Sequence, residues 1–499
     1  MVRFAGDFVK ETTIHQDDEN DKLSNITNDT DKKIVKNIIF VAISNILTLL
    51  SGILVGFILP KIMSKADYGY YKTFTLYLSY VGLFHFGFID GIYLIYAGFK
   101  YETLDKEKFR LYSRFLIIFQ SIISLLIVIT AIPLLKNYVG VIILCLGINL
   151  LLQNVTSYYQ FISQITGRFR ELSFRNVIKA LLTSISICVL TLLFYFKVIS
   201  IVNYTIYILV YTGIQALLVI WYIFTYRDIT FGKAKQFKTE RNNIIHLFKI
   251  GIPLLIANLV SGLILSIDRQ FVSILFEIED YAVYAFAYNM LNLITTVIAA
   301  ISTVLYPTIK TYNEEQLKNN YNRLIAIISI VVAFCIGAYY PLKFILETFL
   351  NNYLDSLPIF RVILPSLLIS SCISMIMFNY YKSLNKQGAY FVISIIILGV
   401  SIVANAISYM LFKTTISISI ASVIVMILWY FIVEPLIVKK FKINTLKNIL
   451  YIASIMTVFY TLTEFVENVF LGFAIYFIAF IVITIIFHYH LIKSKFKSY

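Results

Sequence analysis

The stretch from Asn45 to Tyr71 reads NILTLLSGILVGFILPKIMSKADYGYY, in which an apolar run leads into a short basic loop and then into Asp67-Tyr-Gly-Tyr. A helix needs about 20 mainly apolar residues to cross the hydrocarbon core of a bilayer. Together with the apolar residues that precede it from about Ile38, this run is long enough to cross. The stretch therefore predicts a transmembrane helix, a short polar turn, and a return into the membrane.

The rest of the chain repeats this alternation of apolar runs and short polar segments. Hydrophobic residues make up 59% of the sequence and charged residues 14%, against roughly 25% charged in soluble domains. The sequence predicts an all-α polytopic membrane protein with about fourteen transmembrane helices. The runs are Ile38–Pro60, Thr73–Ala97, Leu111–Leu134, Tyr138–Ile162, Val177–Phe196, Tyr204–Thr225, Ile244–Phe276, Tyr281–Ile309, Leu324–Leu350, Leu357–Leu384, Tyr390–Phe412, Ile416–Val438, Leu446–Phe465 and Val469–Leu491.

The positive charge of the chain, +15 in total, is distributed unevenly over the connecting loops. If the loops alternate between the two sides, 33 of the 42 lysines and arginines fall on the side of the N-terminus and 9 on the other. Lysine and arginine accumulate in cytoplasmic loops. The bias persists to the C-terminal lysines, so an even number of spans with both termini in the cytoplasm is predicted. This topology signal also explains the charge without a nucleic-acid partner.

A weak internal repeat divides the chain at its longest internal polar segment. At an offset of 213 residues, the first run and its exit loop align with the seventh run and its exit loop. The aligned pairs are Asn45 with Asn258, Asp67 with Asp280, Tyr68 with Tyr281, and Tyr71 with Tyr284. Six spans in each half give a parallel repeat with a cavity between two lobes. The predicted divisions are a polar cytoplasmic tail (1–33), an N-terminal six-helix lobe (34–226), a cytoplasmic linker (227–243), a C-terminal six-helix lobe (244–440), and two added helices with a basic tail (441–499).

The sequence carries no recognisable enzyme signature. It has no GxxxxGK[ST] loop for a nucleotide, no HExxH and no GxSxG. The five histidines are scattered, and the four cysteines lie singly in apolar runs. We therefore expect no catalytic residues, no metal site, no cofactor and no enzymatic activity.

Ionisable residues inside apolar runs are costly in lipid, and they usually face a bundle interior or water. Asp268 and Arg269 lie in the middle of the seventh run, which favours a role in a cavity. His85 and Asp90, five residues apart in the second run, form a second candidate pair. Three further residues lie at the ends of runs, where long side chains reach the membrane interface: Lys179, Lys382 and Glu434.

Three segments resemble the polysaccharide biosynthesis transporters, which include the O-antigen and lipid-linked oligosaccharide flippases. The superfamily also holds the multidrug and toxin extruders. The first segment, GFILPKIMSKADYGYYKTF at 56–74, is similar to the helix, basic loop and acidic-Tyr-Gly pattern of the family. The second and third are the seventh run, with its Gly-x-Pro start and mid-helix Asp-Arg, and the Gly-Arg loop QITGRFRELSFRNVIKALL after the fourth run. The resemblance covers the chain from about Lys33 to its end.

The resemblance implies a carrier that moves an isoprenyl-pyrophosphate-linked glycan between the leaflets of the cytoplasmic membrane of a bacterium. The implied partners are the lipid-linked glycan, membrane lipid, a polysaccharide polymerase and glycosyltransferases. Cationic groups must then meet the pyrophosphate, and Arg269, Lys61 and Lys179 are the candidates, with Asp268 holding Arg269 in place.

Two departures from the family pattern bear on the function. No run is rich in cations, so the sequence shows no strongly basic cavity. The first run lacks a carboxylate and has Asn45 as its main polar marker, which makes a multidrug extruder that uses a protonated acid there a poorer match. The alternatives are a cation-coupled multidrug exporter and a membrane scaffold of a glycan assembly complex that does not itself transport.

Overall fold

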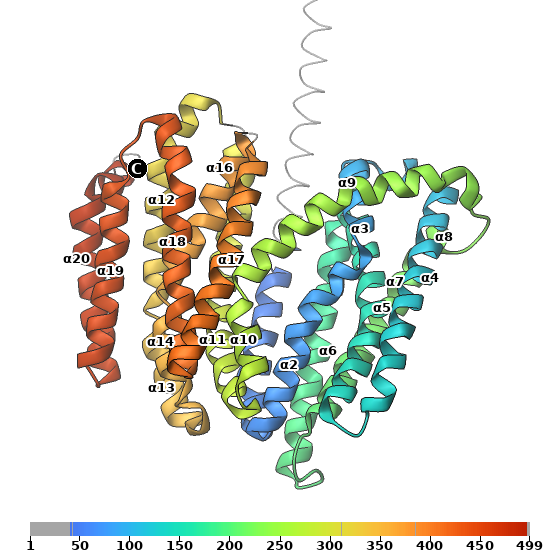
Figure 1. The fold of residues 1–499 in the computed structure, drawn as a ribbon, viewed down its shortest axis with the longest axis horizontal. Helices are drawn as coiled ribbons and strands as arrows, with labels where there is room; N and C mark the ends of the chain where they lie inside the picture. The colour runs from blue at the N-terminus through green and yellow to red at the C-terminus, as the bar shows by residue number, and fades with distance from the viewer. Residues whose placement is uncertain (1–39, 42, 311, 385, 497–499) are drawn as a thin grey trace, which may run out of the picture.

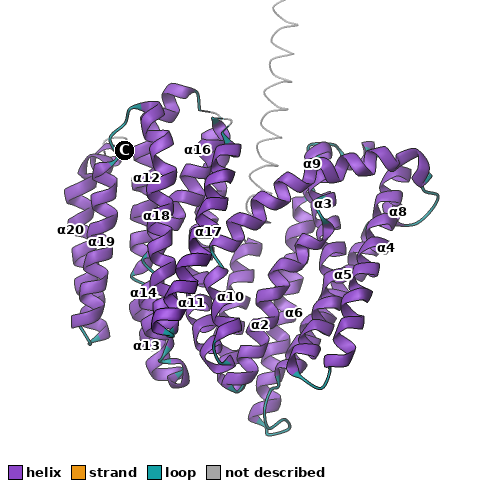
Figure 2. Cartoon of the chain, viewed as in Figure 1, coloured by secondary structure: helices purple, strands orange, loops and turns teal. Residues whose placement is uncertain are grey.

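The structure is a computed structural model that describes residues 40–496 with the exception of 42, 311 and 385. The predicted tail at 1–33 lies outside the described residues. Every regular element in the described part of the chain is a helix, and no strand occurs there (Figure 2). Thirteen helices are long and apolar enough to cross a membrane, or up to fourteen if one bent pair counts as a span. The prediction of an all-α polytopic membrane protein is confirmed.

The helices follow one another with short connections. The first helix is Ile43–Ile62. The others are α2 (Lys65–Val81), α3 (Phe88–Tyr96), α4 (Lys106–Ala131), α5 (Tyr138–Ile165), α6 (Phe169–Tyr195), α7 (Tyr204–Thr225), α8 (Arg227–Thr230), α9 (Phe237–Ile264), α10 (Ile267–Leu275), α11 (Ile278–Lys310), α12 (Glu314–Ile336), α13 (Tyr339–Phe349), α14 (Ser356–Ile363), α15 (Ser366–Ser371), α16 (Phe378–Ser383), α17 (Gln387–Phe412), α18 (Thr415–Phe441), α19 (Leu446–Phe465) and α20 (Val469–Phe496). A π-helical stretch, Cys372–Met377, joins α15 to α16.

Figure 1 shows two groups of helices side by side, α2 to α8 on the right and α11 to α18 on the left, with α19 and α20 at the outer left edge. The groups meet where α2 packs against α11. We call the end of the molecule that holds residues 227–236 the linker end and the opposite end the far end. The domain boundaries expected from the sequence stay a prediction. Residues 237–243 of the expected linker form the first two turns of α9.

The second apolar run, expected as one span, is a bent pair of helices. The stretch Lys65–His85 meets Phe88–Tyr96 at an angle of 61°. The bend occurs where Phe86 and Gly87 both adopt positive φ, 49° and 82°. This left-handed geometry ends a helix, and glycine adopts it without a steric penalty. The charge pattern of the loops does not reveal this bend. Helices α2 and α3 together still run from the far end to the linker end, so the loop that follows lies on the same side as it would after a straight helix.

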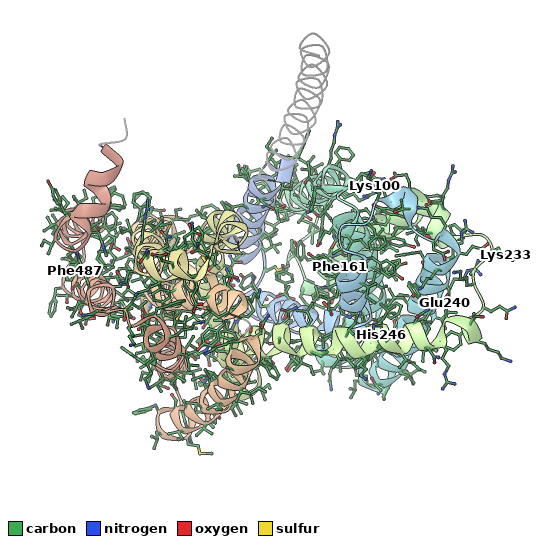
Figure 3. The ribbon with its side chains drawn as sticks, turned by 90° about the horizontal axis from the view of Figure 1, so that it is seen from above. Lys100, Phe161, Lys233, Glu240, His246 and Phe487 are labelled. Carbon is green, nitrogen blue, oxygen red and sulfur yellow. The ribbon has the colours of Figure 1, made fainter. Side chains whose placement is uncertain are left out.

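The seventh run, also expected as one span, breaks at Leu265 and Ser266 into α9 and α10. Pro253 lies inside continuous α9. The long helix α9 crosses the linker end obliquely, packing against α4 near its start, against α3 around Leu247 and Gly251, and against α17 (Figure 1). Seen from above, it runs past Glu240 and His246 along one edge of the first group (Figure 3). One helix therefore contacts both groups.

Glycines allow α9 to lie directly on the backbone of α3. A Cβ on Gly251 would collide with the carbonyl oxygen of Gly87, and a Cβ on Gly91 would collide with that of Leu247. At these two positions only glycine fits, because the obstacle is backbone and cannot turn aside. The crossing of α3 and α9 is thus a fixed contact between the linker helix and the first group.

Candidate functional site

The segment that carries the family resemblance builds the contact between α2 and α11. Ser64 caps α2 by accepting a hydrogen bond from the backbone of Asp67 at 3.0 Å, and its hydroxyl donates to the Asp67 carboxylate at 2.6 Å. The other Asp67 oxygen accepts from the backbone of Tyr204 at 3.1 Å, which fixes the start of α7. Gly69 leaves room for the carbonyl of Ile278, so the two helices approach closely at their starts. These motif residues are therefore structural.

The internal repeat has a structural counterpart in these two helices. Asp67 is the third residue of α2, and Asp280 is the third residue of α11. Tyr68 and Tyr281 follow them, and both are buried. Helices that occupy equivalent places in the repeat therefore pack against each other at the centre of the molecule.

A cavity of about 280 Å³ lies between α2, α10 and α11. Its lining includes residues of α2 and residues of α11 that are 213 positions apart in the sequence. The pairs that line it are Lys72 with Ala285, Thr75 with Tyr288, Leu76 with Asn289, and Ser79 with Asn292. Tyr71, Tyr281 and Arg269 complete the lining. The cavity thus lies between the two halves of the repeat, where a parallel repeat places a transport site.

The polar groups that remain without partners in this cavity are donors. Lys72 Nζ donates to Asn289 Oδ1 at 3.2 Å, which leaves Asn289 Nδ2 buried without a hydrogen-bond partner. Arg269 Nε is also buried without a partner. Buried donors without partners are costly, so these groups favour a ligand that supplies acceptor oxygens. Two cations on the same cavity make an anionic ligand the best match.

Asp268 contacts both the backbone of Arg269 and the ring on which the Arg269 guanidinium lies. The buried Asp268 carboxylate accepts hydrogen bonds from the hydroxyl of Tyr284 at 2.7 Å, from the hydroxyl of Tyr288, and from the backbone N–H of Arg269 at 2.8 Å. The Arg269 guanidinium lies over the ring of Tyr288, 4.8 Å from its centre. The carboxylate therefore fixes the ring on which the guanidinium rests, and it contributes no oxygen to the lining of the cavity.

The other predicted site residues lie away from this cavity. Lys61 is exposed, and its Nζ donates to the carbonyl of Phe349 at 2.7 Å. Lys179 on α6 is partly buried, with its Nζ 5.7 Å from the centre of the Tyr211 ring on α7.

His85 and Asp90 do come together, but at the bend between α2 and α3. His85 Nδ1 lies 3.8 Å from an Asp90 oxygen and accepts from the backbone of Gly87 at 3.1 Å. Both side chains are buried beside the crossing with α9. Of the six residues singled out from the sequence, only Arg269 lines the cavity, and Asp268 supports it.

Sequence reasoning missed Lys72 and Asn289. Lys72, Thr75 and Ser79 follow one another at helical spacing, so they share a polar face of an otherwise apolar helix. That face was a usable signal, but the second run was placed from Thr73 onward, which left Lys72 in a loop. Glu434 was also misjudged: it is buried in α18 and accepts from Tyr430 at 3.0 Å, so the expectation that it reaches the interface is wrong.

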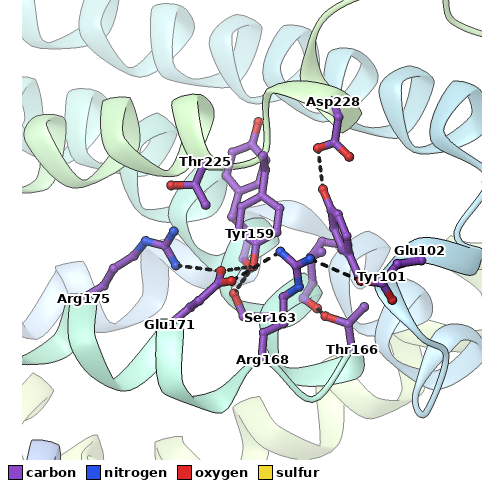
Figure 4. Close-up of polar contacts among 12 residues, drawn as sticks. Tyr101, Glu102, Tyr159, Ser163, Thr166, Arg168, Glu171, Arg175, Thr225 and Asp228 are labelled. Atoms are coloured by element: carbon purple, nitrogen blue, oxygen red, sulfur yellow. Dashed lines mark hydrogen bonds and ion pairs between the residues drawn. The ribbon is translucent and has the colours of Figure 1, made fainter.

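The Gly-Arg loop, the third segment of the resemblance, lies in a polar cluster at the linker end (Figure 4). The Arg168 guanidinium stacks on the ring of Tyr101 at 3.7 Å and lies 3.4 Å from Glu171. Arg175, only 4% exposed, stacks on Tyr222 at 4.2 Å and lies 3.7 Å from the same carboxylate. This cluster ties the ends of α5, α6 and α7 together and uses the charges of the loop in doing so.

The linker is fixed to α4 by a second set of contacts. Lys235 donates to Asp105 at 2.5 Å, and this hydrogen bond holds the pKa of Asp105 below its ordinary value. Arg110 donates to the carbonyl of Lys233 at 2.9 Å. Several lysine and arginine side chains at this end are therefore engaged in contacts within the chain.

Residues 34–313 match the model of the family described as polysaccharide biosynthesis protein, which is more than half of the chain. The chain belongs to this family. The resemblance inferred from the sequence is confirmed. Comparison with curated proteins gives no match.

Several solved structures share the fold. The lipid II flippase MurJ in an inward closed conformation is similar with a TM-score of 0.66 and 16% identity, over 92% of this chain and all of that one. A MOP superfamily transporter from Pyrococcus furiosus gives 0.54 and 13% identity, over 82% of this chain and 97% of that one. A MATE protein in a straight conformation also gives 0.54 and 13%, over 85% and 97%. These likenesses concern the fold, which is that of membrane transporters.

Proposed function

We propose that this protein is a flippase for a lipid-linked oligosaccharide or polysaccharide repeat unit in the biosynthesis of a surface polysaccharide. Family membership and the shared fold with a lipid II flippase support this function. The loop charges support a cytoplasmic linker end, so both termini face the cytoplasm of a bacterium and the far end faces outward. The substrate is an isoprenyl-pyrophosphate-linked glycan. A polymerase and glycosyltransferases are its proposed functional partners.

The observation that carries this proposal is the set of donors in the central cavity. Lys72, Arg269 and Asn289 line one space, and no acidic residue is among its described lining. A pyrophosphate offers several anionic oxygens, which can accept from the Lys72 ammonium and the Arg269 guanidinium at once. Buried in a space of about 280 Å³, such contacts would hold the head of the substrate while the sugars and the lipid chain extend from it.

Transport then requires the contact between α2 and α11 to open on one side and close on the other. The cavity lies on that contact, so its cations would follow the substrate through both states. The sequence shows no nucleotide-binding motif, so we propose that an ion gradient or the membrane potential, with onward use of the glycan, gives the direction. The protein itself makes and breaks no covalent bond in this scheme.

The same cavity argues against a cation-coupled multidrug exporter, despite the likeness to MATE proteins. A cationic drug would meet Lys72 and Arg269 without a carboxylate to offset them, since the oxygens of Asp268 are already bonded. A non-transporting scaffold would have no use for buried donors without partners, and each of these donors costs stability.

A deletion strain tests the three functions together. Deletion should abolish the surface glycan, and the wild-type gene should restore it, while the Lys72→Ala, Arg269→Ala double variant should leave lipid-linked glycan on the inner leaflet. Lys61→Ala, which removes a cation outside the cavity, is the matched control and should restore the glycan. Full glycan from a double variant present at wild-type abundance would refute transport and favour the scaffold. Altered drug accumulation with normal glycan would favour the exporter.

A further inference from the structure

A second hollow, more apolar than the first, opens beside the central cavity. This groove has a volume of about 370 Å³ and lies between α2, α5, α10 and the start of α11. Its walls are mainly apolar or aromatic, and the lining residues that carry a hydroxyl are Thr73, Tyr77, Tyr138 and Ser273. Among its lining residues Ile142 is buried, whereas Tyr138 and Val139 are 42% and 40% exposed. It therefore leads from the surface of the protein inward.

Helix α10 borders both the groove and the donor-lined cavity. Arg269 lines the cavity and Ser273 lines the groove. Residues four apart in a helix lie on the same face, about 6 Å apart along the axis. A molecule whose charged end met Arg269 could thus continue past Ser273 into the groove without leaving the protein.

At the equivalent place in the other half of the repeat, the described residues are closely packed. The offset of 213 residues pairs Thr73 with Phe286 and Tyr77 with Met290. Both of these side chains are fully buried. The ring of Phe286 packs against that of Tyr353, with 4.8 Å between centres, so packed side chains occupy this place. Of these two equivalent places, therefore, the one beside α2, α5 and α10 forms an apolar groove and the other is packed.

We propose that this groove holds the part of the isoprenyl chain nearest to the pyrophosphate, while Lys72 and Arg269 hold the pyrophosphate itself. This inference rests on the proposed function and adds to it the path of the lipid chain. Tyr138 starts α5 and Ile278 starts α11, which places the groove at the far end. On the proposed topology the chain leaves sideways into the outer leaflet. Lipid tails are already in an apolar solvent, so the groove orients the chain and adds little affinity.

Site-specific photocrosslinking in the full-length protein tests this path. A photoreactive residue replaces Ile143 in the groove, and in a second protein it replaces Ile185, an isoleucine of α6 that is 57% exposed. The proteins are placed in phosphatidylglycerol nanodiscs with a radiolabelled long-chain isoprenyl pyrophosphate. The label at position 143 should exceed that at 185 by about tenfold. Adding Arg269→Ala should reduce it to the level at 185.

Each alternative result overturns the proposal in a distinct way. Equal labelling at 143 and 185 would show that bulk lipid fills the groove. Labelling at 143 that survives Arg269→Ala would show a lipid site independent of the cavity. In a third outcome, the wild-type protein retains the isoprenyl pyrophosphate while a photoreactive residue in the groove, at position 143 or in place of Thr73, is not labelled. That result would refute the proposed path of the lipid chain and leave the proposed flippase function standing. If wild-type protein does not retain this probe above a phospholipid control, the flippase and the groove fall together.

Discussion

The two copies of the repeat use one helical frame in two different ways. In the first copy an unbroken helix, Ile43–Ile62, leads to α2, and the cavity receives Lys72. In the second copy the helix breaks before α10, and the cavity receives Arg269. Each cation has a small residue at the equivalent place: Ala285 for Lys72 and Gly56 for Arg269. Equivalent helices of the two copies, α2 and α11, form walls of the cavity, and residues that differ between the copies provide its two cations.

Removing the cation of the second copy should have the largest effect. Arg269→Ala deletes charge-assisted contacts worth about 1.5–3 kcal/mol in total, which corresponds to about a ten- to hundredfold loss of glycan transport. Transport of labelled lipid-linked glycan in proteoliposomes measures this loss. Arg269→Lys keeps the charge and should retain part of the activity. Wild-type transport by the alanine variant would show that the donors of the cavity do not contact the substrate.

Moving the cation of the first copy to the second copy should have the next largest effect. Lys72→Ala should reduce transport about tenfold, since one charge-assisted contact is lost. Ala285→Lys places an ammonium group at the equivalent position on α11, on the wall of the same cavity. The double variant should recover transport severalfold in the same assay. If Ala285→Lys deepens the defect of Lys72→Ala, the two walls are not interchangeable and the repeat gives shape only.

Filling the small position of the first copy should have a moderate effect. A Cβ on Gly56 would collide with the side chain of Asn289, whereas a Cβ on Gly52 would meet nothing within 4 Å. Gly56→Ala should displace the amide that accepts from Lys72 and cost about 1 kcal/mol of stability, with a severalfold loss of transport. Gly52→Ala, one turn earlier on the same helix, is the matched control. Similar melting temperatures for the two variants in detergent would contradict this account.

The paired tyrosines should give the smallest effect. The hydroxyl of Tyr281 donates to the carbonyl of Lys72 at 3.3 Å, while the buried hydroxyl of Tyr68 has no hydrogen-bond partner. Tyr281→Phe should therefore lower the free energy of unfolding by about 0.5–1 kcal/mol. Tyr68→Phe should leave it unchanged or raise it slightly. An equal decrease in both, read from thermal unfolding in detergent, would show that the hydrogen bond from Tyr281 to the carbonyl of Lys72 does not account for the loss.

The sequence predicts the helical architecture well because hydropathy and loop charge act over whole segments. The all-α fold and most span positions depend on some twenty residues at a time, so single exceptions do not disturb them. The bend at Gly87 and the break at Leu265–Ser266 depend on one or two residues, and both lie inside apolar runs. Hydropathy does not change at such points, so it does not reveal them.

The candidate site was only partly predictable for a related reason. Asp268 and Arg269 stand out because apolar sequence flanks them on both sides. Lys72 and Lys61 each lie near the end of an apolar run, and the packing of α2 against α11 turns Lys72 toward the cavity. Lys61 instead bonds to the chain at Phe349, nearly three hundred residues away. Contacts between distant segments decide which cation is used.

The glycine crossing of α3 and α9 has a consequence for biogenesis. Gly87 and Gly91 are synthesised about 160 residues before Gly251, the residue that covers them. Until the ribosome has made α9, the backbone on this face of α3 lacks its native neighbour. The first six spans are therefore an incomplete folding unit, and a chain that stops before α9 would expose this face to lipid or to quality-control proteases.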